Sequence, residues 1–171
     1  FLAAYRIVES KKGVSANQIK RELSISYKTA WYLCHRIREA MRQAQSTAKP
    51  LSGIIEADET FVGGKKRHVG HGFKGNKAIV VGVVQRGGEV RLQVAEDRTR
   101  KTLHEIVLKN TTPETEAIYT DDWGAYQGLA DENTRHETVN HSQEEYVRGD
   151  VHTNGVEGVW SLLERSIMGS Y

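Results

Sequence analysis

The sequence has little cysteine and little proline. A single cysteine, Cys34, occurs among the 171 residues, which excludes an intramolecular disulfide and a cysteine-based zinc site. One unpaired thiol is typical of a reducing compartment, so we expect a cytoplasmic protein. One of the two prolines, Pro50, is expected to end a helix, because the residue before a proline disfavours helical geometry.

Long hydrophobic runs are also missing. No apolar stretch approaches the roughly 20 residues needed to cross a bilayer, so no membrane partner is expected. The N-terminal residues 1–4 lead into a polar pattern, which excludes a secretory signal. The chain does not begin with Met and stops at Tyr171 without a tail, and we therefore expect a fragment cut at both ends.

Charge is nearly balanced overall but unevenly distributed. The net charge is +2, yet residues 1–50 contain ten Lys/Arg against three Asp/Glu. Residues 51–171 contain fourteen Lys/Arg against nineteen Asp/Glu. A basic N-terminal part joined to an acidic one indicates that the first binds a polyanion and the second gathers cations.

The basic part has the pattern of three short helices. The first spans about 2–10, and Ser15 caps a second, with Gln18 as its reciprocal capping partner. Ser26 begins a longer third helix that runs to about Arg42. Helix, short turn and longer basic helix are typical of the helix-turn-helix, although such units also occur in proteins that bind no DNA.

The third helix supplies the candidate DNA contacts. Its exposed start, Tyr27, Lys28 and Thr29, would face the major groove, and Arg36 would lie closer to phosphate. The apolar positions at helical spacing are expected to pack inward: Ala30, Leu33, Ile37 and Met41. We expect a helix-turn-helix module over residues 1–45 and a linker over residues 46–52.

Residues 53–171 are predicted to form an α/β domain with a mixed sheet. The order is three strands, helix, strand, short helix, strand, helix, and the first three strands should form an antiparallel meander. A helical crossover would then bring in the fourth strand. This is the element order of a ribonuclease-H-like domain. The expected strands cover 53–61, 78–84, 90–95, 116–120 and 135–140. The expected long helices run to about Lys109, with Asp97 or Thr99 as the cap, and from about 154 onwards.

Three acidic residues are placed where they can share metal ions. Asp58 and Asp121 follow strand-like runs, and Glu157 lies near the start of the last helix. Two or three carboxylates suffice for Mg²⁺, and a metal pair performs phosphoryl chemistry on nucleic acid. Each residue also has a plain structural explanation: Asp121 could cap the next helix, and Glu157 could favour the helix dipole. The prediction therefore rests on the three together.

Neighbouring residues have assigned roles as well. His152 could bind metal or phosphate, and Asn154 is expected mainly to cap the last helix; both are possible supporting residues of the site. The aromatic side chains are expected in the core rather than as base-stacking platforms: Trp123, Tyr126 and Trp160. A Gly-rich, basic segment after the first strand supplies further candidate DNA contacts: Lys65, Lys66 and Arg67.

Three motifs resemble the bacterial insertion-sequence transposases of the DDE type with an ISXO-like catalytic domain. They are EADETFVGG at 56–64, TDDWGAY at 120–126 and VHTNGVEGVWSLL at 151–163. Upstream, GVSA at 13–16 and YKTAW at 27–31 are similar to the helix-turn-helix of that family. The resemblance covers nearly the whole chain.

The resemblance implies a ribonuclease-H-like transposase that cleaves insertion-sequence ends and transfers the 3′-hydroxyl to target DNA. Asp58, Asp121 and Glu157 match the catalytic triad, which would hold two Mg²⁺ or Mn²⁺ ions. The implied partners are double-stranded DNA, as transposon ends and target, and further copies of the chain on paired ends.

Two alternatives remain open. Glu164 stands where members of the family usually carry a basic residue, so the chain could be an impaired relative that only binds DNA. A structure-specific nuclease of the same fold would cut without joining.

Overall fold

The computed structural model describes residues 1–63, 77–140 and 147–170. The predicted DNA contacts Lys65, Lys66 and Arg67 lie outside the described residues. The chain divides into two compact units, one made of residues 1–49 and 159–171 and the other of residues 50–158. Each unit is described by itself.

The N-terminal part of the first unit contains the three predicted helices. The caps of the second and third helices are those predicted from the sequence. The Ser15 hydroxyl accepts from the Gln18 N–H at 3.2 Å, and the Ser26 hydroxyl accepts from the Thr29 N–H at 3.1 Å. The Gln18 side chain itself donates to Glu22, at 2.9 Å. The helices are α1 (Leu2–Glu9), α2 (Ala16–Leu23) and α3 (Tyr27–Ser46).

The packing of α3 confirms part of its predicted apolar side. Ala30 is fully buried, and Leu33 and Ile37 are partly buried against the same cluster. Cys34 is buried beside them, whereas Met41 is 47% exposed, so its assignment to the core is wrong. The helix also runs to Ser46, past the predicted end near Arg42.

The second unit contains one sheet, which within the described residues has five strands in the order β3-β2-β1-β4-β5. Strands β1 to β3 are antiparallel neighbours, and β4 and β5 join in parallel. Both the meander and the crossover are confirmed. The strands are β1 (Leu51–Val62), β2 (Ala78–Gln85), β3 (Val90–Ala95), β4 (Thr111–Asp121) and β5 (Arg135–Val139).

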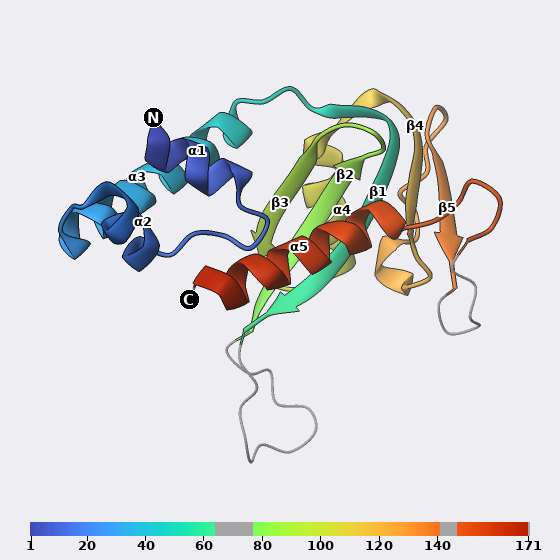
Figure 1. The fold of residues 1–171 in the computed structure, drawn as a ribbon. Coiled ribbons are helices and arrows are strands. Elements are labelled where there is room, and N and C mark those ends of the chain that lie inside the picture. The colour runs from blue at the N-terminus through green and yellow to red at the C-terminus, as the bar shows by residue number, and fades with distance from the viewer. Residues whose placement is uncertain (64–76, 141–146, 171) are drawn as a thin grey trace, which may run out of the picture. The chain divides into compact units, whose positions relative to one another are not determined.

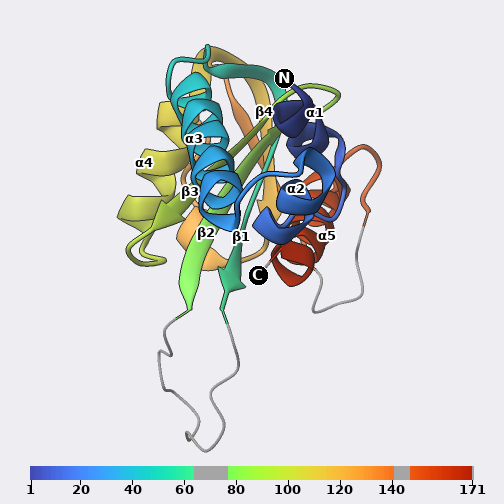
Figure 2. The same ribbon diagram turned by 60° about the vertical axis from the view of Figure 1, so that its left-hand side comes forward.

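The helices of this part of the chain follow the predicted order. They are α4 (Arg100–Asn110), the short 3₁₀ helix η1 (Gly124–Tyr126) and α5 (Asn154–Ser170), whose first residues belong to the second unit. Thr99 caps α4 by accepting from the Thr102 N–H. Five strands in this order, with β2 antiparallel, give the predicted ribonuclease-H-like mixed α/β fold (Figures 1 and 2). Among the described helices, none has the length and apolar character that a bilayer crossing needs.

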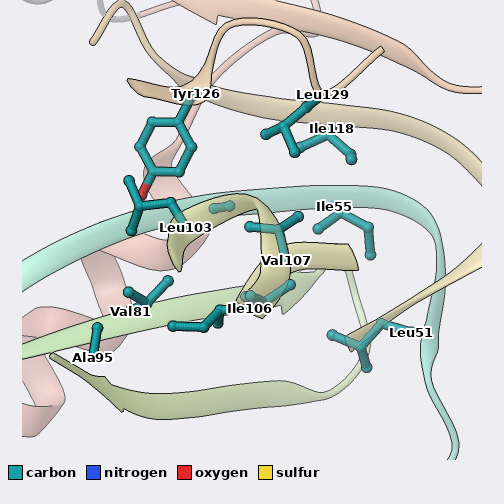
Figure 3. Close-up of a cluster of buried hydrophobic side chains, with 12 residues drawn as sticks. Leu51, Ile55, Val81, Ala95, Leu103, Ile106, Val107, Ile118, Tyr126 and Leu129 are labelled. Carbon is teal, nitrogen blue, oxygen red and sulfur yellow. The ribbon is translucent and has the colours of Figure 1, made fainter. Parts of the chain in front are cut away.

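One face of the sheet packs against α4 and forms the main core. Ile55 and Ala57 of β1 point toward α4, where Leu103 and Val107 join them in the main core cluster (Figure 3). Tyr126 is fully buried in the same cluster and Trp123 packs against it, which confirms their assignment to the core. Because side chains alternate along a strand, the residues between these positions face the other side.

Candidate active site

Asp58 and Asp121 lie on neighbouring strands, and both point away from α4. Glu56 of β1 pairs with Tyr119 of β4 in parallel register, so two residues further on Asp58 is level with Asp121. Alternation along each strand puts both carboxylates on the face opposite the main core. On its other side Asp58 pairs with Gly82, which has no side chain to occupy the space beside it. The structure therefore brings these two predicted residues together.

Negative charge gathers where β1 and β4 lie side by side. Burial is the main cause of the raised pKa of Glu59, and the charge of Asp121 adds to it. Tyr126, which donates to Glu59 at 2.7 Å, has a raised pKa because of its burial and the nearby charges of Glu59, Asp58 and Asp121. Arg98 offsets part of this charge, since it contacts Glu59 at 3.3 Å.

Asp121 also has a structural role. Its Oδ1 accepts from the Trp123 N–H at 3.2 Å, which turns the chain from β4 toward η1. The next carboxylate, that of Asp122, accepts from the Asn140 side chain at 2.9 Å instead. Asp121 therefore forms a turn ahead of η1 and does not cap it, because the N-cap residue of η1 is Trp123 and has no side-chain cap bond. The turn is compatible with a metal-binding role, because a carboxylate has several acceptor positions.

Glu157 lies in the first turn of α5. Its backbone N–H donates to the Thr153 carbonyl at 3.1 Å, and the Thr153 hydroxyl donates to its Oε1 at 3.2 Å. The side chain is exposed. The position favours a carboxylate through the helix dipole, as expected from the sequence.

The start of α5 is fixed to the sheet by a carboxylate that is not one of the predicted three. Glu56 is 1% exposed, and its Oε2 accepts from the Val156 N–H at 3.1 Å. Its Oε1 accepts from Nε and Nη2 of Arg86, both at 3.0 Å. Glu56 lies on the same face as Asp58, two residues away. The turn that carries Glu157 is therefore bound to the face that carries Asp58 and Asp121.

The two possible supporting residues are placed differently from each other. Nδ1 of His152 lies 3.2 Å from Arg86 Nη2 and 3.4 Å from Glu56 Oε1, inside the same network. Asn154 is exposed and is the first residue of α5. The capping role predicted for Asn154 is wrong, because the helix already begins there and the N–H of Val156 is bound by Glu56.

The candidate DNA contacts of the first unit share the exposed surface of α3. Tyr27, Lys28, Thr29 and Arg36 are all exposed. The Arg36 guanidinium lies 5.9 Å from the centre of the Tyr32 ring, which is itself 58% exposed. This surface combines positive charge with aromatic rings, both of which suit nucleic acid.

The family is decided by the sequence of the second unit together with α5. A profile described as the ISXO2-like transposase domain matches residues 50–171. The chain belongs to this family. The matched region contains the three candidate acids and the network around Glu56.

Two further proteins are similar to this chain. An uncharacterized protein in transposable element ISH50 of Halobacterium salinarum is 29% identical over 182 residues, which cover 96% of this chain. The chain spans 60% of the length of that curated relative. A chain in the cryo-electron microscopy structure of a simian T-cell lymphotropic virus intasome, in complex with a PP2A regulatory subunit, is 16% identical with a TM-score of 0.38. That match covers 70% of this chain and 38% of the chain in the viral structure.

The donor set of this domain suits hard divalent cations only in part. Asp58 and Asp121 offer carboxylate oxygens from adjacent strands, which Mg²⁺ and Mn²⁺ prefer. Within the described residues, however, no three His, Cys, Asp or Glu side chains are grouped as a metal site. The two strand carboxylates suit such an ion by their chemistry, and the turn that carries Glu157 is held to the same face of the sheet by Glu56.

Sequence reasoning missed Glu56, Arg86 and Gly155 as parts of this site. A Glu in the middle of an apolar strand was the available signal, because a buried carboxylate needs partners. Its partners are 30 and 100 residues away along the chain, so periodicity and spacing do not reveal them.

Proposed function

We propose that this chain is the catalytic core of a DNA transposase together with its DNA-binding module. It would cleave the ends of an insertion sequence and transfer the resulting 3′-hydroxyl to target DNA. Asp58, Asp121 and Glu157 are the proposed catalytic residues, with a pair of Mg²⁺ or Mn²⁺ ions as cofactor.

One observation supports this proposal most strongly. Asp58 and Asp121 are level with each other on one face of the sheet, and the first turn of α5 is bound to that face through Glu56. The backbone that carries Glu157 is thus held to the face that carries the two strand carboxylates, in a domain that belongs to a transposase family, and this supports the proposal.

The residues divide the proposed work as follows. Asp58, on the central strand, would contact both ions, Asp121 would hold one and Glu157 the other. Bound there, the ions would activate the attacking oxygen and stabilise the leaving oxygen of an in-line displacement. The negative charges of Asp58 and Asp121, which both act on Tyr126, would favour cations at this place.

DNA binding is assigned to α2 and α3 as a helix-turn-helix. Tyr27, Lys28 and Thr29 would reach the major groove and Arg36 the phosphates. Lys65, Lys66 and Arg67 are retained as proposed contacts from the sequence. Action on paired ends would require a second copy of the chain, by analogy with other transposases.

The deciding experiment compares Asp58→Asn with Asp122→Asn. The substrate is a duplex carrying the terminal sequences of the element that encodes the chain. We expect Asp58→Asn to abolish Mn²⁺-dependent cleavage and to leave duplex binding intact, because it removes one ligand charge without changing shape. Asp122→Asn should retain cleavage, since Asp122 is exposed and bonded to Asn140.

The products separate the alternatives. Joined strands support a transposase, while cleavage without joining would indicate a nuclease of the same fold. Duplex binding without cleavage by the unaltered chain would indicate a relative that only binds DNA, an alternative that the exposed Glu164 favours. Equal cleavage by Asp58→Asn and the unaltered chain would remove Asp58 from the mechanism.

A further inference from the structure

The start of α5 is capped by a residue from another part of the chain. The first N–H groups of a helix have no partner within the helix and must be bound by something else. Here the N–H of Val156 is bound by the carboxylate of Glu56, which comes from the central strand and is almost fully buried. A buried charged acceptor makes a strong and directional bond.

The fit between the strand and the helix requires a glycine. A Cβ built on Gly155 would lie 2.6 Å from Oε2 of Glu56 and 3.1 Å from its Cδ. Real Cβ atoms essentially never come within 3.0 Å of another heavy atom, so the Glu56 carboxylate would have to shift and disturb its bonds to Arg86 and to the Val156 N–H. Gly155 therefore allows the close approach that the bond to Val156 needs.

Arg86 fastens the segment before the helix. Its Nη1 donates to the Asp150 carbonyl at 2.8 Å and its Nη2 to the His152 carbonyl at 3.2 Å. The guanidinium also lies 5.0 Å from the centre of the Tyr119 ring, on the strand that carries Asp121. A planar guanidinium with several donors suits such a junction, and a lysine would not replace it.

We infer that Glu56 and Arg86 are positioning residues that set the place of Glu157 relative to Asp58 and Asp121. This inference rests on the proposed function. Glu157 directly follows Val156, so the bond that fixes Val156 also fixes the backbone from which the Glu157 side chain extends. Metal-binding carboxylates must be held within a fraction of an ångström, and residues behind the ligands commonly provide that accuracy.

The first test compares two glycines of α5 in the full chain. Gly155→Ala puts a methyl group against Glu56, whereas a Cβ on Gly158 meets nothing within 4 Å. We expect Gly155→Ala to accelerate hydrogen exchange of the Val156 N–H by about ten-fold or more. It should also weaken Mn²⁺ binding, titrated with and without a duplex, by about ten-fold. Gly158→Ala should change neither the exchange rate nor the Mn²⁺ affinity, because its Cβ contacts no neighbour and alanine favours the helix.

The second test asks whether Glu56 acts through Glu157. Glu56→Gln should weaken Mn²⁺ binding in the unaltered chain and cause no further loss when Glu157→Gln is already present. A role in overall stability alone would give the same loss in both backgrounds. Urea unfolding checks that each variant folds, and Gly155→Ala keeps every charge, so it remains informative if Glu56→Gln does not fold.

The outcomes can be told apart. Unchanged exchange at Val156 in folded Gly155→Ala and Glu56→Gln would overturn the inference, and so would an equal loss of Mn²⁺ affinity with and without Glu157. Failure of the unaltered chain to bind Mn²⁺, even with a duplex present, would instead overturn the proposed function.

Discussion

Glu56 combines two properties that rarely occur together, a central position in an apolar strand and a negative charge. Removing such a charge from water costs several kcal/mol, which is recovered only when the remaining acceptor positions are well bound. Arg86 and the Val156 N–H bind both oxygens of the carboxylate. We therefore attribute to the buried Glu56 carboxylate the placement of the start of α5 rather than a gain in the free energy of unfolding.

Single residues were predictable where their role is local. The caps Ser15 and Ser26 followed from the residue type and the position before a helical pattern, and both are confirmed. The positions of Asp58 and Asp121 in strands were predicted from the apolar runs before them, whereas the parallel pairing of those two strands is a finding of the structure. Asn154 was misassigned because its local pattern is that of a cap, while the actual acceptor comes from a distant strand.

The burial of His136 leads to a prediction about how the stability of the fold changes at acid pH. Burial lowers its pKa below the ordinary value of 6.5, and the charge of His104 adds to this effect. The unfolded chain then binds more protons than the folded one as pH falls through 6.5, so the free energy of unfolding decreases toward acid. We expect His136→Gln to reduce that loss between pH 7 and pH 5, by at most about 1.4 kcal/mol per pH unit.

Urea unfolding at both pH values measures the effect. His35→Gln is the matched control, because His35 is exposed on α3 and should leave the pH dependence unchanged. An identical acid loss in His136→Gln and the unaltered chain would show that other groups cause it. Because His136→Gln also changes the hydrogen bond between His136 Nε2 and the Thr120 hydroxyl, at 3.0 Å, the free energy of unfolding at pH 7 is compared separately from its change with pH.

At the scale of elements, whether a segment forms a helix or a strand was easier to predict than the residue at which it ends. The apolar run at 78–84 was expected to be a strand, and β2 occupies Ala78–Gln85 with Val80 to Val84 all buried. The end of α3 was placed near Arg42, yet the helix continues to Ser46. Polar interactions along the helix surface accompany this extension, since Arg42 and Gln43 both bind Glu39. Apolar periodicity alone does not report such contacts.

The surface of α3 offers a comparison of two cations. Lys28 is exposed at the helix start, whereas Arg42 is bound to Glu39 at 2.7 Å, which lowers the pKa of that carboxyl to about 2. We expect Lys28→Ala to weaken duplex binding and to reduce the slope of log affinity against log salt by about 1. Arg42→Ala should have a smaller effect, because its charge is already partnered.

Fluorescence anisotropy with a labelled duplex at several salt concentrations measures both quantities. Equal changes in the two variants would mean that the end of α3 contacts DNA as closely as its start. No change in either variant would contradict the assignment of α3 as the recognition helix and favour a packing unit without DNA contact.

At the scale of the whole molecule, topology was predictable because few arrangements satisfy the element order. Three short strands in succession pair as a meander, and a strand reached through a helix joins in parallel. The bulge in β1 was not predictable. The β1–β4 register shifts on both sides of Gly53, whose φ of +73° is a conformation that glycine adopts readily. Such a shift depends on the paired strand, which local sequence does not report.

The uneven charge of the whole chain leads to the last prediction. Residues 1–50 are basic and residues 51–171 acidic, so the position of an added charge should matter as well as its sign. Glu164 is exposed on α5, and Glu164→Lys should strengthen duplex binding and steepen its salt dependence. The control is Glu114→Lys, at an exposed position of β4, because it changes the net charge by the same amount. A gain confined to Glu164→Lys would indicate a DNA contact at that position. Equal gains in both variants would indicate a general effect of net charge, and an unchanged salt slope would argue against contact there.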